Sequence, residues 1–272
     1  MNTAFLCAAC GTQFAEQASP PQRCPLCEDS RAFGTPRGAR QRWTSLAELR
    51  ATHRNRMCEL ETGVFSVVTE PAFGVGQHCL LVRGASGNVL WDCVSLIDDA
   101  TIAAVRAQGG IARIAISHPH FYAAMVEWSR AFGGAPIYVH AADRAWIMRP
   151  DAAVIPWAGA SLRLDEDLTL VHCAGHFPGS AILHRASRGE RPACLFAGDT
   201  INVLEDRVNL SFMHNYPKQL PLPAAAVRQI ARVVEPLEFD RLYGCWPDNR
   251  ILAGGKRAVL RSAAEHIRRF AA

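Results

Sequence analysis

The sequence lacks the features of an exported or membrane-spanning chain. Its first residues contain no basic segment followed by a long apolar run, and no apolar run elsewhere is long enough to span a bilayer. Internal repeats and low-complexity tracts are also missing. We therefore expect a globular cytoplasmic protein with no membrane partner.

The sequence also lacks a large net charge. The net charge is only +4, and 20% of the 272 residues are charged against 49% that are hydrophobic. This balance is typical of a globular chain with one large core and a small appendage. It argues against nucleic acid as a partner, because such proteins usually concentrate Lys and Arg on one face.

Four of the ten cysteines form two pairs near the start of the chain, Cys7 with Cys10 and Cys24 with Cys27. Each pair has C-x-x-C spacing, and four thiolates from two such turns complete a tetrahedral metal site. Residues 1–34 contain few apolar side chains, so we expect metal binding to drive their folding. The segment resembles a zinc-ribbon or rubredoxin-like knuckle. The sequence leaves open whether the metal is zinc or iron. If the knuckle binds a partner, we expect that partner to be a protein.

The segment 35–60 is polar and rich in arginine, and we predict a linker there. Its arginines are Arg37, Arg40, Arg42, Arg50, Arg54 and Arg56. No aromatic stacking pattern accompanies them, so they give no support for nucleic-acid binding.

Residues 61–272 alternate apolar runs with helical patterns. Strands are predicted at 64–68, 78–82, 88–92, 111–116, 137–139, 168–171, 181–183 and 194–197. Amphipathic helices are predicted at 98–108, 224–234 and 258–270, with another around Phe121 to Phe132. This mixture of hairpins and strand–helix units predicts an α/β or α+β sandwich.

Three short segments that each follow a predicted strand carry metal-ligand residues. They are Ser117-His118-Pro119-His120, Gly175-His176-Phe177-Pro178-Gly179-Ser180 and Gly198-Asp199. Residues two apart in extended chain point to the same side, so His118 and His120 can reach one metal.

These motifs, together with Asn88-Val89-Leu90-Trp91-Asp92-Cys93, resemble the metallo-β-lactamase-fold hydrolases over about residues 61–250. The resemblance implies an αββα sandwich with a metal site at one edge. It implies His118, His120 and His176 as metal ligands and Asp199 as the carboxylate that bridges two metals in the family.

The chain departs from the family motif at the ligands of the second metal. The family's Asp-His pair falls at Tyr122-Ala123, and its last His falls at Cys245 or Trp246. We therefore expect one metal in this domain, with Cys245 as the residue that can supply a further ligand.

Three functions fit this pattern. The first is hydrolysis of a small ester, thioester or lactone by a metal-bound hydroxide, with zinc as the metal and Asp199 and Tyr122 as catalytic groups. Tyr122 would donate to the developing oxyanion. The second is an iron oxidoreductase that resembles the persulfide dioxygenases, using His118, His176 and Asp199. The third is a catalytically degenerate, metal-stabilised binding module.

Overall fold

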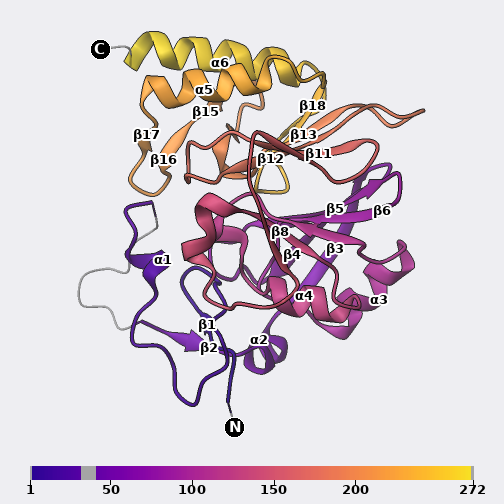
Figure 1. Cartoon of the computed structure of the whole chain (residues 1–272), viewed down its shortest axis with the longest axis vertical. Helices are drawn as coiled ribbons and strands as arrows, with labels where there is room; N and C mark the ends of the chain where they lie inside the picture. The colour runs from indigo at the N-terminus through magenta and orange to yellow at the C-terminus, as the bar shows by residue number, and fades with distance from the viewer. Residues whose placement is uncertain (1, 32–40, 271–272) are drawn as a thin grey trace.

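The computed structural model describes residues 2–31 and 41–270. Within these residues, two large sheets and six α-helices position the sites (Figure 1). The helices are α1 (Pro25–Glu28), α2 (Leu46–Thr52), α3 (Asp99–Ala107), α4 (Met125–Ala131), α5 (Ala224–Val234) and α6 (Gly255–Phe270).

The first sheet has seven strands in the order β3-β4-β5-β6-β7-β8-β9. Its members are β3 (Arg54–Glu61), β4 (Val64–Glu70), β5 (His78–Gly84), β6 (Gly87–Trp91), β7 (Arg113–Ala115), β8 (Ile137–His140) and β9 (Val154–Trp157). The strands up to β6 pair antiparallel, and β6 to β9 pair parallel. The change occurs where α3 begins, because a parallel neighbour needs a crossover connection.

The second sheet has six strands in the order β10-β11-β12-β13-β18-β19. Its members are β10 (Ser161–Arg163), β11 (Leu168–His172), β12 (Ala181–Arg185), β13 (Cys194–Phe196), β18 (Arg241–Tyr243) and β19 (Arg250–Ile251). Two small ribbons extend from this half of the chain. They are β14 (Asn202–Val203) with β15 (Leu210–Ser211), and β16 (Met213–Asn215) with β17 (Leu220–Pro221).

Three buried apolar clusters separate four layers. On β5, Cys79 and Leu81 pack toward α3 and α4, whereas Leu80 and Val82 pack against the second sheet. This division follows from the two-residue period of a strand. A third cluster joins the second sheet to α5 and α6. The predicted αββα sandwich is confirmed, and Figure 1 shows its helices above and below the paired sheets.

The helix boundaries lie close to the predicted ones, and a side-chain cap marks the start of α3. The Asp98 side chain accepts a hydrogen bond from the Thr101 N–H at 2.7 Å and caps α3, which lies within the predicted helix 98–108. α5 has its predicted bounds, and α6 begins three residues before the predicted start. The predicted helix from Phe121 to Phe132 is shorter, because a 3₁₀ turn at Pro119–Phe121 precedes α4.

The described part of the segment 35–60, where a linker is predicted, contributes strands both to the knuckle and to the large sheet. β2 (Trp43–Thr44) pairs with β1 (Leu6–Cys7) in the knuckle, and β3 pairs with β4 in the large sheet. β3 alternates half-buried and exposed side chains, which made it read as polar. Arg37 and Arg40 lie outside the described residues. Within the described ranges, no helix is long and apolar enough to cross a bilayer.

Candidate metal centres

Four predicted ligands from three loops converge at one edge of the sandwich. His118 follows β7, His120 lies in the adjoining 3₁₀ turn, His176 follows β11, and Asp199 follows β13. One ligand atom of each lies within 4.8 Å of the others. Nε2 of His118 is 3.1 Å from Asp199 Oδ2, and Nε2 of His176 is 3.3 Å from Nδ1 of His120.

The electrostatics of this His–Asp site suit a cation. Burial lowers the pKa of His176 well below its usual value, and the neighbouring imidazoles lower it further. Burial alone would raise the pKa of Asp199, but the imidazoles of His118, His120 and His176 lower it far below its ordinary range. Neutral imidazoles and an ionised carboxylate are the states in which these groups bind metals. Asp199 Oδ1 is buried without a hydrogen-bond partner among the described residues. The three imidazole nitrogens and a carboxylate oxygen of Asp199 together fit a zinc or iron ion.

Hydrogen bonds behind the imidazoles fix their orientation. The Ser117 hydroxyl lies 3.0 Å from Asp92 Oδ2 and 2.8 Å from Nδ1 of His118, while the Ser117 N–H donates to Asp92 Oδ1 at 2.7 Å. Nδ1 of His176 lies 3.0 Å from the Met213 carbonyl oxygen. Both contacts leave the other ring nitrogen facing the site, an arrangement common in metal-binding histidines.

Gly198 allows the carboxylate loop to approach these residues. It has φ +55, and a Cβ there would lie 2.6 Å from both Cβ and Oγ of Ser117. Glycine adopts this left-handed conformation without a steric penalty, so Asp199 can reach the histidines.

Two residues that hold Asp199 are not among the predicted site residues. The Gln77 amide donates to Asp199 Oδ2 at 2.9 Å, and the Tyr216 hydroxyl donates to the Asp199 main-chain oxygen. Gln77 lies in a glycine-rich loop with no distinguishing pattern. The aromatic and polar composition of the loop around Tyr216 is the signal that marks the second residue.

Tyr122 and Cys245 lie outside the set of four ligands. The buried Tyr122 hydroxyl donates to the Asp143 carbonyl oxygen at 3.4 Å, which offers no support for the predicted oxyanion role. Cys245 is buried, and burial raises the pKa of its thiol, as do the nearby carboxylates of Asp199 and Asp92. In the described chain, Cys245 is not among the residues whose ligand atoms converge.

The four knuckle cysteines form the second convergent set. Sγ of Cys7 lies 3.5 Å from Sγ of Cys27, and Sγ of Cys10 lies 3.6 Å from Sγ of Cys24. A disulfide would bring two sulfurs to about 2.05 Å. Four sulfurs about 2.3 Å from a central zinc would instead be separated by about 3.8 Å, so these spacings suit a tetrahedral metal.

The four thiols are electrostatically linked. Hydrogen bonds from Cys10, Cys24 and Cys27 lower the pKa of Cys7, whereas contacts with Cys24, Cys27 and Cys7 raise that of Cys10. Close thiols therefore cannot all ionise without a cation among them.

The chain has the metallo-β-lactamase fold. A B3 metallo-β-lactamase with an active-site glutamic acid superposes with a TM-score of 0.52 and 19% identity over 76% of this chain and 87% of that one. The DIM-1 metallo-β-lactamase gives a TM-score of 0.55 and 12% identity over 78% and 98% of the two chains.

Sequence comparison places the chain in a family. The uncharacterized protein YmaE of Bacillus subtilis (strain 168) is 40% identical over 266 residues, which are 97% of this chain and 96% of YmaE. This chain belongs to the same family as YmaE. No family model matches the sequence.

Proposed function

We propose that this chain is a metal-dependent hydrolase of small esters, thioesters or lactones, with one metal at the His–Asp site. The observation that carries this proposal is the buried convergence of His118, His120, His176 and Asp199, with one carboxylate oxygen unpartnered among the described residues. The similarity of the fold to metallo-β-lactamases supports the same reading. Zinc is the proposed metal.

The chain's own residues prepare the site for a reacting carbonyl. A bound divalent metal would polarise that carbonyl and lower the pKa of a water molecule. The Ser117 hydroxyl holds the His118 ring, and the Met213 carbonyl oxygen holds the His176 ring. The Gln77 amide donates a hydrogen bond to Asp199 Oδ2. Asp199 Oδ2 lies 3.1 Å from Nε2 of His118 and 3.7 Å from Nδ1 of His120, so this oxygen would bind the metal, and the unpartnered Oδ1 would accept a hydrogen bond from the attacking water.

The enclosure of the site favours a small substrate. The side chains of His118 and Asp199 are 0% and 3% exposed, and that of His120 is only 9% exposed. A bulky acyl group has little room beside them. We therefore propose a small-molecule substrate whose carbonyl can enter near His120.

The experiment combines metal analysis with turnover of the full chain. Protein purified without added metal is analysed for zinc and iron, then tested with model thioesters, lactones and esters. We expect zinc and hydrolysis. We expect His118→Ala to abolish turnover, whereas His184→Ala, at a half-buried histidine of β12 outside the site, should leave it unchanged.

Other outcomes would overturn the proposal. Iron with oxygen uptake in the presence of a persulfide would favour the oxidoreductase alternative. Stoichiometric metal with no turnover of any substrate class would favour the metal-stabilised binding module.

A further inference from the structure

The knuckle and the His–Asp site share one side chain, Phe177. This residue is completely buried and belongs to the same apolar cluster as the four knuckle cysteines. Its ring centroid also lies 5.6 Å from that of His118, 5.0 Å from that of His120 and 5.2 Å from that of His176. One aromatic ring therefore contacts the knuckle on one side and all three candidate imidazole ligands on the other.

A side chain just after α1 contacts the same ring. Arg31 places its guanidinium carbon 4.1 Å from the Phe177 ring centroid, within the range of a cation–π contact. Asp29 holds that guanidinium through hydrogen bonds from Nε at 2.5 Å and Nη2 at 2.7 Å. Because Arg31 lies four residues after Cys27, the knuckle determines where this cation sits.

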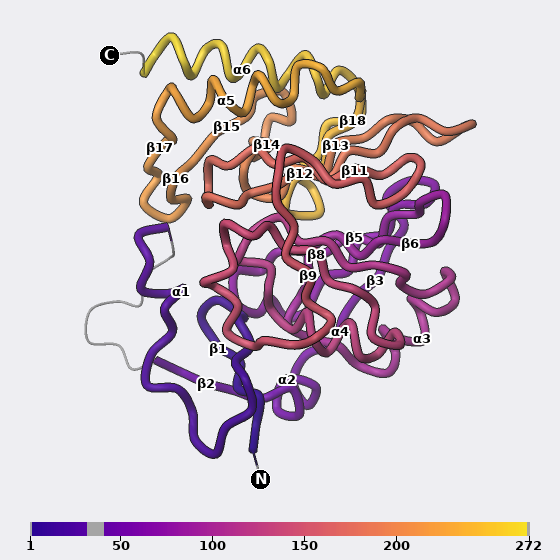
Figure 2. The backbone as a smooth tube through the Cα atoms, in the orientation of Figure 1, coloured from indigo at the N-terminus to yellow at the C-terminus, as the bar shows by residue number. Residues whose placement is uncertain are grey.

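A second connection runs through the hairpin formed by β16 and β17. The Asn215 side chain donates to the Ser30 carbonyl oxygen, and the Ser30 hydroxyl lies 3.2 Å from Nε2 of His214. Figure 2 shows this hairpin descending to the segment after α1. The same hairpin supplies the Met213 oxygen to His176 and the Tyr216 hydroxyl to the Asp199 main-chain oxygen.

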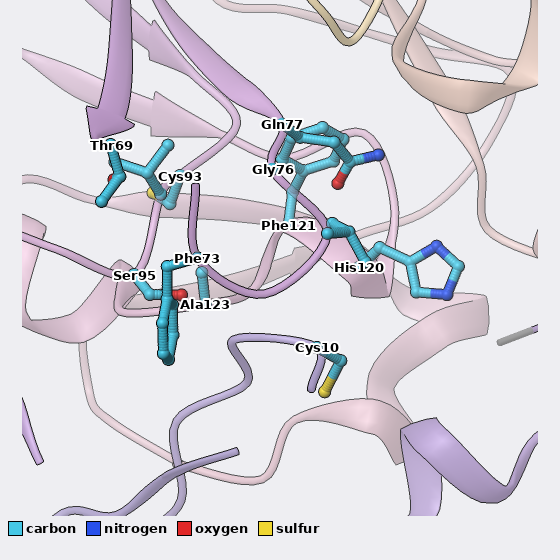
Figure 3. Close-up of a pocket in the computed structure, with 12 residues that line it drawn as sticks. Cys10, Thr69, Phe73, Gly76, Gln77, Cys93, Ser95, His120, Phe121 and Ala123 are labelled. Atoms are coloured by element: carbon cyan, nitrogen blue, oxygen red, sulfur yellow. The ribbon is translucent and has the colours of Figure 1, made fainter. Parts of the chain in front are cut away.

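One small cavity borders both candidate metal centres. A cavity of about 20 Å³ is lined by both Cys10 and His120 (Figure 3). That volume accommodates about one water molecule. The main chain of Gly11 accepts a hydrogen bond from the Ser95 hydroxyl at 2.9 Å, and the main chain of Gln13 donates to the Ala123 oxygen at 3.2 Å. The knuckle is therefore docked on the large domain and forms one wall of the His–Asp site.

We propose that the knuckle is a built-in part of the His–Asp site, and that Phe177 and Arg31 are positioning residues through which metal at the four cysteines sets metal affinity at the three histidines. Residues 2–31 have too small a core to keep this wall in place without a cation. Loss of that cation leaves four crowded thiols and frees Phe177 and the Asp29–Arg31 segment to move. The imidazoles then lose the ring that restricts their rotamers.

The proposal rests on the metal centre of the proposed function but not on hydrolysis. Cobalt(II) titration of the metal-free full chain distinguishes the two sites, because only the cysteine site gives a thiolate-to-cobalt charge-transfer band. The weaker visible bands that remain after the spectrum of the cysteine site is subtracted report the His–Asp site. Circular dichroism shows whether each variant is folded.

Phe177→Leu is the decisive variant, since leucine keeps an apolar contact with the knuckle but removes the aromatic ring. We expect an unchanged thiolate band, altered visible bands and an affinity at the His–Asp site that is lower by about tenfold, as for other residues that orient metal ligands. Wild-type visible bands and wild-type affinity in this variant would overturn the proposal.

Cys24→Ser tests the coupling from the knuckle side. We expect loss of the thiolate band together with at least a comparable loss of affinity at the His–Asp site. Cys58→Ser is the matched control, because Cys58 lies on β3 and belongs to neither set. Unchanged metal affinity at the His–Asp site in a folded Cys24→Ser protein would refute the coupling. If the Cys24→Ser protein is unfolded, the Phe177→Leu variant decides.

The two proposals can fail separately. Wild-type protein that binds cobalt at both sites but hydrolyses nothing contradicts the proposed function while the coupling stands. Variants that bind cobalt as the wild type does, in a protein that turns over substrate, contradict the coupling alone.

Discussion

Ser117→Ala removes one hydroxyl that connects Asp92 to His118. That hydroxyl lies 3.0 Å from the carboxylate and 2.8 Å from Nδ1 of the imidazole, and all three side chains are buried. The methyl group of alanine leaves Asp92 Oδ2 and His118 Nδ1 without this partner, which costs folding stability on the order of 1–3 kcal/mol. The main-chain hydrogen bond from Ser117 to Asp92 remains.

The larger consequence concerns metal binding. The hydroxyl holds the His118 ring so that Nε2 faces Asp199, and removing such a partner typically lowers metal affinity about 10–100-fold. This range corresponds to about 1.4–2.7 kcal/mol. Zinc competition with a chromophoric chelator, corrected for the cysteine-bound metal by the cobalt thiolate band, measures the change.

The chain contains a matched control for this experiment. Ser66 Oγ lies 2.8 Å from Nδ1 of the buried His78, and His78 is not a candidate ligand. Ser66→Ala should therefore lose a similar amount of stability but keep wild-type metal affinity. Equal metal affinity in the Ser117 and Ser66 variants would refute the reasoning that the Asp92–Ser117–His118 chain orients a ligand.

Three further predictions concern the surroundings of the same site. His176→Ala should keep its fold and its thiolate-bound metal but lose the metal of the His–Asp site, and retention of both metals would show that His176 is only a packed loop residue. Tyr216→Phe removes the donor to the Asp199 main-chain oxygen, so we expect a stability loss of about 1 kcal/mol and weaker metal binding; an unchanged chelator competition would contradict this. Burial raises the pKa of Asp143 from 3.8 to about 6, so the folded chain binds more protons than the unfolded chain between these values and loses stability as the pH rises through them. Asp143→Asn keeps an acceptor for the Gly179 N–H and should flatten this dependence, with a gain in the free energy of unfolding of up to about 3 kcal/mol at pH 8. Urea unfolding at pH 4 and pH 8 measures this gain. Parallel pH profiles of the wild type and the variant would disprove the prediction.

Periodicity and spacing predicted much of the fold. The two-residue alternation of β5 and the helical spacing of α5 reflect local rules, since each side chain faces one side of its element. β3 was missed because an edge strand with half-buried and exposed residues has no strong apolar pattern. Its identity as a strand depends on pairing with β4, which is a long-range contact.

The residues with ligand chemistry can be identified from the chain alone, because the C-x-x-C pairs and the His-x-His turn are patterns of local spacing. The groups that surround these residues depend on the folded arrangement. Gln77 and Tyr216 reach Asp199 across 122 and 17 residues of sequence separation, and Phe177 joins the knuckle to the histidines. Such contacts arise from the packing of layers and loops, which no local pattern of side chains specifies. The Tyr122 hydroxyl likewise donates to the Asp143 carbonyl oxygen, 21 residues away in the sequence.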